Sequence, residues 1–133
     1  MPGMEAASSY TDLRRQEAVS AKRLYAIDAL CTPDSPVSEV GQLIDIAVAA
    51  VAAGGGHVLD ASHVVFPNGA ITLVLILAES HLCIHTWPEE NLIAVDLFSC
   101  GAIDGQAVLD RLTASLRLTQ VHVRQVPRGL PPA

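Results

Sequence analysis

The sequence predicts an α+β fold: a two-layer α/β sandwich in which both helices cover one face of a mostly antiparallel sheet. The chain has 133 residues, of which half are hydrophobic and 17% are charged, and this composition suits one globular core. Its predicted elements follow in the order β-α-β-β-β-β-α-β. Helices set apart from a run of adjacent strands are typical of α+β sandwiches.

The N-terminal part of the chain divides into a tail, a strand and a helix. We expect residues 1–21 to be a flexible tail, because they lack apolar periodicity, and residues 22–133 to form a single domain. Residues 22–30 (KRLYAIDAL) predict a strand. Residues 33–56 predict a helix, with a proline near its start and three glycines past its end. Its expected apolar stripe is Val40, Leu43, Ile44, Ala47, Val48 and Val51.

Four strands are predicted to follow this helix. The first is residues 57–66 (HVLDASHVVF). Residues 70–77 (AITLVLIL) are a continuous apolar run rich in β-branched residues, which predicts a strand buried on both faces or central in its sheet. Residues 81–86 (HLCIHT) alternate, and residues 92–100 (LIAVDLFSC) predict the next strand. Pro88 lies in the loop between these two, because proline cannot donate to a strand ladder.

The chain is predicted to end with a second helix and a last strand. Residues 104–118 predict the helix, with Asp104 as its N-cap and with Val108, Leu112 and Leu116 on one face. Residues 120–126 (QVHVRQV) alternate and predict the strand.

The net charge of the chain argues against some classes of binding partner, and its cysteine content indicates the redox state of its compartment. The net charge is −6, which argues against nucleic acid and against an anionic membrane surface as partners. No apolar run reaches the roughly 20 residues that span a bilayer, and no basic segment followed by an apolar stretch suggests a signal peptide. Three cysteines without a dense framework indicate a reducing, cytoplasmic compartment.

An unusual cluster of polar residues lies at 77–90 (LAESHLCIHTWPEE), beside two of the most apolar strands. Glu79 and Ser80 fall between two predicted strands, so we expect them in a tight turn at one end of the sheet. A serine there can be an ordinary turn residue. Polar groups at such a place nevertheless cost free energy unless they are satisfied or functional.

Several interpretations of this cluster stay open on the residues alone. The side chains of His81, Cys83 and His85 should share one face of their strand, and with Cys100 they can form a zinc site, although the spacing is not a common zinc pattern. A thiol near a histidine can also act as a nucleophile, but neither cysteine follows a glycine-rich elbow or begins a helix. Cys83 can equally be a small core residue, and Trp87 a cap over the core.

The segment AESHLCIHTWPE followed by AVDLFSCG closely resembles the self-processing segment of the short prokaryotic S-adenosylmethionine decarboxylases. Members of that family read close to ESHLSIHTWPE and then AVDIFTCG. The resemblance runs from about Phe66 to Gly101, and the predicted element order fits from about Lys22 to Val126. It implies that the chain cuts itself between Glu79 and Ser80, giving a β chain of residues 1–79 and an α chain of residues 80–133.

The resemblance also implies roles for individual residues in cleavage and catalysis. Ser80 would become the pyruvoyl cofactor, whose ketone forms a Schiff base with the substrate amine. His85 would transfer the proton in the elimination step of cleavage. Thr72 stands where many members have a serine that assists cleavage, and it keeps the hydroxyl. Cys100 would be the proton donor in decarboxylation. No metal ion is implied.

The expected substrate is S-adenosylmethionine, and its decarboxylated product donates the aminopropyl group of spermidine. By the same resemblance, Phe66 and Trp87 would stack on the adenine, and Glu89 would bind ribose hydroxyls or a cationic group. The family's pockets lie between protomers, so we expect a homodimer of αβ units.

Two departures from the family pattern flank the expected pocket and leave the substrate open. Residues 70–73 read AITL where members commonly read GVSG. After the WPE motif, this chain reads ENLIAVD where many members read YGYAAVD. The missing aromatic residue and the extra acid, Glu90, keep two alternatives. One is a pyruvoyl decarboxylase of another basic amino acid, such as ornithine or arginine. The other is an unprocessed, non-catalytic or metal-binding relative.

Overall fold

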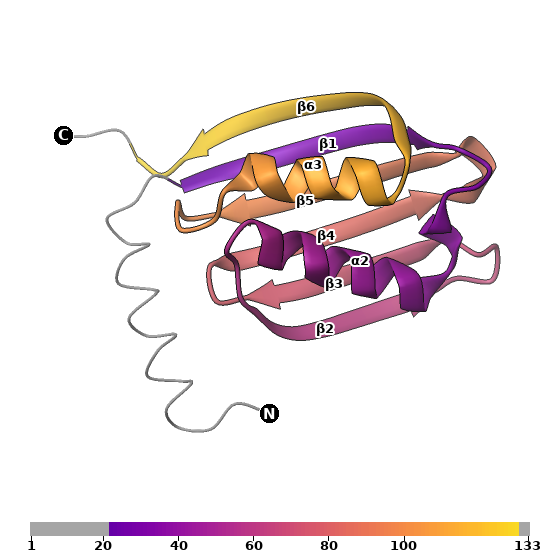
Figure 1. Cartoon of the computed structure of the whole chain (residues 1–133), viewed down its shortest axis with the longest axis horizontal. Coiled ribbons are helices and arrows are strands. Elements are labelled where there is room, and N and C mark those ends of the chain that lie inside the picture. The colour runs from indigo at the N-terminus through magenta and orange to yellow at the C-terminus, as the bar shows by residue number, and fades with distance from the viewer. Residues whose placement is uncertain (1–21, 131–133) are drawn as a thin grey trace.

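The computed structural model describes residues 22–130 as one six-stranded sheet with two helices on one face (Figure 1). The predicted tail, residues 1–21, lies outside the described residues, as do residues 131–133. The predicted α+β class and the order β-α-β-β-β-β-α-β are confirmed. The elements are β1 (Lys22–Cys31), the 3-10 helix η1 (Pro36–Ser38), α2 (Val40–Ala53), β2 (Val58–Val65), β3 (Ile71–Leu77), β4 (Ser80–Trp87), the 3-10 helix η2 (Pro88–Glu90), β5 (Leu92–Ser99), α3 (Gly105–Ser115) and β6 (Leu118–Arg128).

The strands lie in the order β2-β3-β4-β5-β1-β6, and every neighbouring pair is antiparallel. The hairpin β3–β4 and the pair β4–β5 join strands that are consecutive in the chain, whereas β1 lies between β5 and β6. Pro127 is tolerated in β6 because this is an edge strand, where a missing backbone donor breaks no inner ladder.

Alternating apolar residues make one sheet face the core, which both helices cover (Figure 1). Every second residue of β3, β4 and β5 is buried there, as the two-residue period of a strand requires. From the other layer, α2 and α3 bury leucines and small residues against this face. The largest fully buried side chains include Leu43, Leu73, Leu82, Leu97 and Leu112.

The first predicted helix is shorter than expected and is interrupted. The backbone of Glu39 is extended, with φ −99° and ψ 103°, and this separates η1 from α2. The Glu39 carboxylate accepts a hydrogen bond from the backbone N–H of Gly41, so it caps α2. The expected apolar stripe holds at Leu43, Ala47 and Val51, which are fully buried, but Val48 is 37% exposed.

Residues 70–77 were predicted to be buried on both faces or central in the sheet. The central position is confirmed, because β3 is an internal strand, whereas burial on both faces does not hold for a single chain. Its helix-facing residues are buried, whereas Ile76 on the opposite face is 48% exposed. Val64 of β2 pairs with Thr72 on the same face and is 52% exposed. The face without helices, called the open face below, therefore exposes apolar side chains to solvent in one chain.

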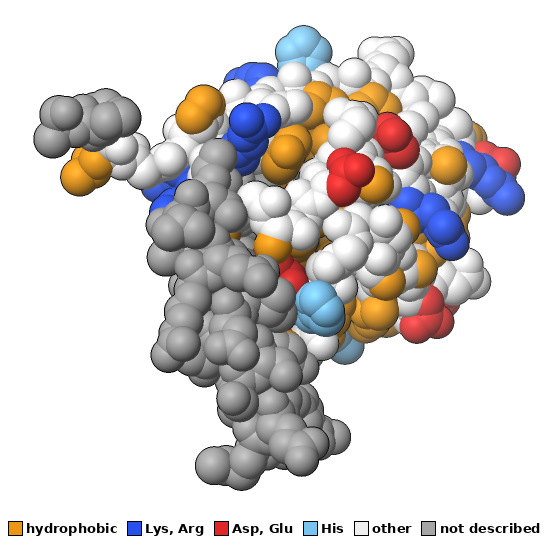
Figure 2. All heavy atoms as spheres, turned by 60° about the vertical axis from the view of Figure 1, so that its left-hand side comes forward, with side chains coloured by type: hydrophobic (Ala, Val, Ile, Leu, Met, Phe, Trp, Pro, Cys, Tyr) orange, Lys and Arg blue, Asp and Glu red, His pale blue; other side chains and the backbone are white. Residues whose placement is uncertain are grey.

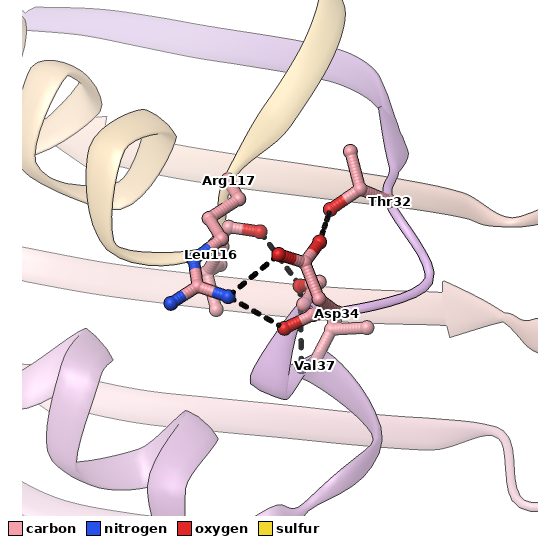
Figure 3. A network of polar contacts seen from close by, with 6 residues as sticks. Thr32, Asp34, Val37, Leu116 and Arg117 are labelled. Atoms are coloured by element: carbon pink, nitrogen blue, oxygen red, sulfur yellow. Dashed lines mark hydrogen bonds and ion pairs between the residues drawn. The ribbon is translucent and has the colours of Figure 1, made fainter.

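A polar network ties the β1–α2 connection to the turn between α3 and β6 (Figure 3). Thr32 Oγ1 donates to Asp34 Oδ1 at 2.6 Å, and Arg117 donates to Asp34 Oδ2 at 2.8 Å. Ser35 Oγ donates to the carbonyl oxygen of Leu116 at 2.6 Å. The hydrogen bond from Thr32 and the nearby guanidinium lower the pKa of Asp34 below its ordinary value.

The described surface carries mixed charges. On the coloured part of the face in Figure 2, Lys and Arg side chains stand apart among acidic, neutral and hydrophobic ones. In the range 22–130, no helix is long and apolar enough to cross a membrane.

Candidate active site

The turn between β3 and β4 holds the Glu79–Ser80 bond, as predicted. Ser80 begins β4 with φ of 149°. Positive φ values of this kind are normally left to glycine, and a residue held there stores roughly 1–3 kcal/mol of backbone strain. The fully buried Glu79 on one side and the strand ladder on the other maintain this geometry.

The Glu79 carboxylate has no exposed surface, and His57 satisfies it. The backbone N–H of His57 donates to Oε1 at 2.9 Å, and the ring Nδ1 lies 2.6 Å from Oε2. A buried carboxylate is costly without such partners. The carbonyl of His57 also accepts from the backbone N–H of Ala78 at 2.9 Å.

Cys100 lies at the same end of the sheet as the turn. Ser80 is the cross-strand partner of Ser99, the last residue of β5, and Cys100 follows directly. Directly opposed residues in an antiparallel pair have Cα atoms about 4.5–5.5 Å apart. The thiol is nearly buried, with 4% exposure. The structure thus brings together three predicted site residues, called the turn cluster below: Glu79, Ser80 and Cys100.

The other predicted site residues gather at the opposite end of β3 and β4. Thr72 and His85 are cross-strand partners, and Thr72 Oγ1 lies 3.3 Å from His85 Nδ1. They line a cavity of about 400 Å³ together with two aromatic side chains and one acid. Asn68 donates to that acid at 3.4 Å. We call these five residues the cavity cluster: Phe66, Thr72, His85, Trp87 and Glu89.

The turn cluster and the cavity cluster are far apart within one chain. Ser80 and His85 are five residues apart on the same strand, which at about 3.3 Å per residue separates them by about 16 Å. Their side chains also differ in direction, because His85 lies on the open face with His81 and Cys83, while the alternate residues of β4 face the helices. A single chain therefore cannot place the His85 ring at the Glu79–Ser80 bond.

No cluster of ligands among the described residues supports the alternative of a zinc site. Among residues 22–130, no three His, Cys, Asp or Glu side chains are arranged to hold a metal ion. His81, Cys83 and His85 share a face as predicted, but Cys100 lies in the turn cluster. Burial, and then the nearby Asp96, raise the pKa of the Cys83 thiol, which disfavours the thiolate that a metal ligand or nucleophile needs.

Two features of this region could not be found from the sequence. His57 contacts Glu79 although 22 positions separate them, and no motif or spacing marks it. A second cavity of about 580 Å³ lies beside the turn cluster, on the helix side. Its lining includes Arg23, Tyr25, Ser99, Asp104 and Gln125.

A family model and curated relatives match this chain. The model described as S-adenosylmethionine decarboxylase matches residues 23–129. A protein named S-adenosylmethionine decarboxylase proenzyme 2 from Bacillus anthracis is 38% identical over 77 residues, covering 57% of this chain and 63% of that protein. The match therefore spans less than two thirds of that relative. A protein named S-adenosylmethionine decarboxylase proenzyme from Thermotoga maritima is 37% identical over 99 residues, covering 72% of this chain and 75% of that protein.

A solved structure shares the fold. It is described as the adenosylmethionine decarboxylase from Aquifex aeolicus, and it superposes with a TM-score of 0.72 at 24% identity. The superposition covers 86% of this chain and 96% of that one. At this identity the likeness establishes the architecture of the sheet and its two helices.

Proposed function

We propose a function from one premise: the chain belongs to the S-adenosylmethionine decarboxylase family, whose model matches residues 23–129. We infer that it cleaves itself at Glu79–Ser80 and then decarboxylates S-adenosylmethionine, giving the aminopropyl donor for spermidine. The observation that carries this proposal is the turn itself, where a serine with φ of 149° follows a fully buried, doubly bonded glutamate. The relatives' name, proenzyme, agrees with a precursor that matures by cleavage.

Cleavage would begin at the strained turn. Ser80 Oγ attacks the carbonyl carbon of Glu79; the new C–O bond forms, the amide C–N bond breaks, and the hydroxyl proton passes to the nitrogen. The reaction frees the Ser80 nitrogen from the chain, so it releases the strain held in φ. A fixed turn also supplies the orientation on which intramolecular rates depend.

Elimination and hydrolysis would complete the cleavage. Loss of the Ser80 α-proton breaks the Cβ–O bond and expels the Glu79 α-carboxylate, leaving a dehydroalanine. Addition of water and loss of ammonia then leave a pyruvoyl group at the head of residues 80–133. Ser80 suits this origin, because it follows the turn directly and pairs across the sheet with Ser99, the neighbour of the buried Cys100.

We assign catalysis to residues around the new terminus. The pyruvoyl group supplies the electron sink for decarboxylation. Cys100 is the acid that returns a proton to the substrate α-carbon after CO₂ has left, a role supported by its place beside the cross-strand partner of Ser80. Its low exposure protects that proton from exchange with bulk water.

We infer a homodimer in which each site takes residues from both chains. The separation of about 16 Å between Ser80 and His85 on one strand supports this arrangement, because a proton cannot be transferred over that distance. A second copy packed on the open face would bring its cavity cluster to the turn cluster of the first. Exposed apolar side chains on that face, such as Val64 and Ile76, are suited to such burial.

The cavity cluster is the proposed substrate pocket. Phe66 and Trp87 line it, are partly exposed and offer flat apolar faces to adenine, while Glu89 offers a carboxylate to ribose hydroxyls. Thr72 and His85 form a hydrogen-bonded pair in the same cavity and are assigned to the cleavage step. We place the enzyme in the cytoplasm on its three cysteines without a disulfide framework.

The substrate is tested by CO₂ release from a small panel. Purified, fully cleaved protein is given S-adenosylmethionine, ornithine and arginine, each labelled at its carboxyl group. The proposal expects release from S-adenosylmethionine at least about tenfold faster than from the amino acids, since only that substrate fills the aromatic pocket. Faster release from ornithine or arginine would assign the chain to another basic amino acid, and the acids Glu89 and Glu90 would then be its cation-binding candidates.

A further inference from the structure

We propose that His57 is a positioning residue for the cleavage of the Glu79–Ser80 bond. This inference rests on the self-cleavage proposed above and adds a residue that lies outside the cleavage motif. His57 holds the Glu79 side chain so that the Glu79 carbonyl carbon stays within reach of Ser80 Oγ.

His57 contacts the turn at three points. Its carbonyl accepts from Ala78 N–H at 2.9 Å, and its own N–H donates to Glu79 Oε1 at 2.9 Å. Its ring Nδ1 lies 2.6 Å from Glu79 Oε2. His57 therefore holds Glu79, the residue on the amino side of the scissile bond, through the Glu79 side chain and through the backbone of its neighbour Ala78.

The loop that carries His57 is itself rigidly held. A Cβ at Gly56 would lie 2.7 Å from a methyl of Val51, so only glycine allows the loop this close to α2. The backbone N–H of Gly56 donates to the Val51 carbonyl at 2.9 Å, and the carbonyl of Gly54 accepts from Asp104 N–H at 2.9 Å. The ends of both helices thus fix the position of the His57 backbone.

The buried carboxylate makes the ring contact important. Glu79 has no exposed surface, whereas the His57 side chain is 54% exposed, so the histidine reaches inward from the surface to pair with it. Without the ring, Oε2 loses this partner, and the place of the half-exposed ring opens to solvent. The carboxylate would then turn toward solvent and move the adjoining carbonyl.

A small movement of that carbonyl is enough to slow cleavage. The attacking oxygen and the carbonyl carbon must approach to about 3–3.5 Å, and a displacement of about 1 Å can reduce a rate about 100-fold. The alanine variant His57→Ala keeps both backbone bonds and removes only the ring contact. We expect it to slow cleavage by about 10- to 100-fold.

The test compares cleavage half-times of full-length variants made in a cell-free translation reaction. Samples are denatured at intervals, and the precursor and its two fragments are quantified by mass. His57→Asn is the rescue variant, because an Asn side-chain N–H stands where Nδ1 stands in histidine. His63→Ala is the matched control, since His63 is an exposed histidine on β2. Each change is also made on Ser80→Ala, where thermal unfolding reports stability without cleavage.

The proposal expects slow cleavage in His57→Ala, recovery of most of the rate in His57→Asn, and a wild-type rate in His63→Ala. Hydroxylamine, which cuts esters, should release little extra fragment from His57→Ala, because the block precedes the ester. Cleavage of His57→Ala within about twofold of wild type would overturn the proposal, as would an Asn variant as slow as Ala.

Failure of this inference can be told apart from failure of the proposed function. If wild type and His63→Ala both stay uncut, the self-cleavage itself is wrong. If wild type is cut and His57→Ala is cut equally fast, only the role of His57 is wrong. If His57→Ala is too unstable to fold, Glu79→Gln and Glu79→Leu replace it. Gln keeps a partner for both His57 groups, so it should cleave at least about tenfold faster than Leu, and equal rates would overturn the proposal.

Discussion

Mixed dimers test whether each site is shared between two chains. The variant His85→Ala keeps Ser80 but lacks the assigned proton-transfer group, and Ser80→Ala keeps His85 but lacks the attacking hydroxyl. Neither variant should cleave alone, because each lacks one of the two groups in both of its chains. The two residues lie about 16 Å apart on β4, so each group would have to come from a different chain. A dimer containing one chain of each kind should hold one intact site and one site with neither group.

The expected yield follows from two-fold symmetry. When the two variants are produced in equal amounts and pair at random, about half of the chains that carry Ser80 lie in mixed dimers. About half of all chains that carry Ser80 should therefore be cleaved. Decarboxylase activity should return to about a quarter of the wild-type value per chain, since one site in four is intact.

The assay uses co-expression of the two variants with different affinity tags. The fragments are quantified under denaturing conditions in the unsorted mixture, to which the yields above apply. Tandem purification then isolates the mixed dimers, in which all chains with Ser80 should be cleaved and activity should be about half the wild-type value per chain. Cleavage of His85→Ala on its own at the wild-type rate would show that His85 is not needed. An uncleaved mixed dimer would refute the shared site, because every residue assigned to it is then present in one pair of chains.

Four further variants test single residues. Cys100→Ala should still cleave but decarboxylate at least about 100-fold more slowly, and an unchanged turnover would remove Cys100 from the acid role. The pKa of Asp34 is held below its ordinary value, chiefly by the hydrogen bond from Thr32. Asp34 therefore stabilises the fold above its unfolded pKa, and this contribution is lost as pH falls through its folded pKa. Asp34→Asn should thus lower the melting temperature at pH 7, and the difference should shrink in acid; a constant difference would contradict the sign. Gly105→Ala would place a Cβ 2.4 Å from the Tyr25 ring of β1, so it should destabilise the protein by about 1–3 kcal/mol in urea unfolding. Gly41→Ala would place a Cβ no closer than 3.6 Å to any neighbouring atom, so it should stabilise α2 by up to about 1 kcal/mol in the same measurement.

The fold could be predicted because most of its signals are local. Periodicity of two or 3.6 residues reports burial on one face, and Asp104 caps α3 through Ala107 N–H as the sequence predicted. The interruption at Glu39 was missed because its side chain caps α2 from an extended backbone one residue before the helix. The exposure of Ile76 was missed because an apolar strand has the same sequence whether a helix or a second chain covers its outer face.

The site was predictable only where it is contiguous in sequence. Glu79 and Ser80 were placed in the turn correctly because they lie between two apolar runs. Only the strand register of the folded sheet pairs Ser80 with Ser99 and places it far from His85. This register depends on how side chains align across the sheet, so no single segment of the sequence predicts it. His57 reaches the turn by a long-range contact, and no local pattern predicts such contacts.

The measurement that tests the central proposal most directly is the intact mass of the purified protein under denaturing conditions, compared with Ser80→Ala. We expect two chains for wild type, residues 1–79 and residues 80–133, the second with a pyruvoyl group at its head and no free amine. We expect a single full-length chain for Ser80→Ala. A single uncut wild-type chain after long incubation would show that the protein does not process itself, and a cut at any bond other than Glu79–Ser80 would rule out Ser80 as the origin of a pyruvoyl group.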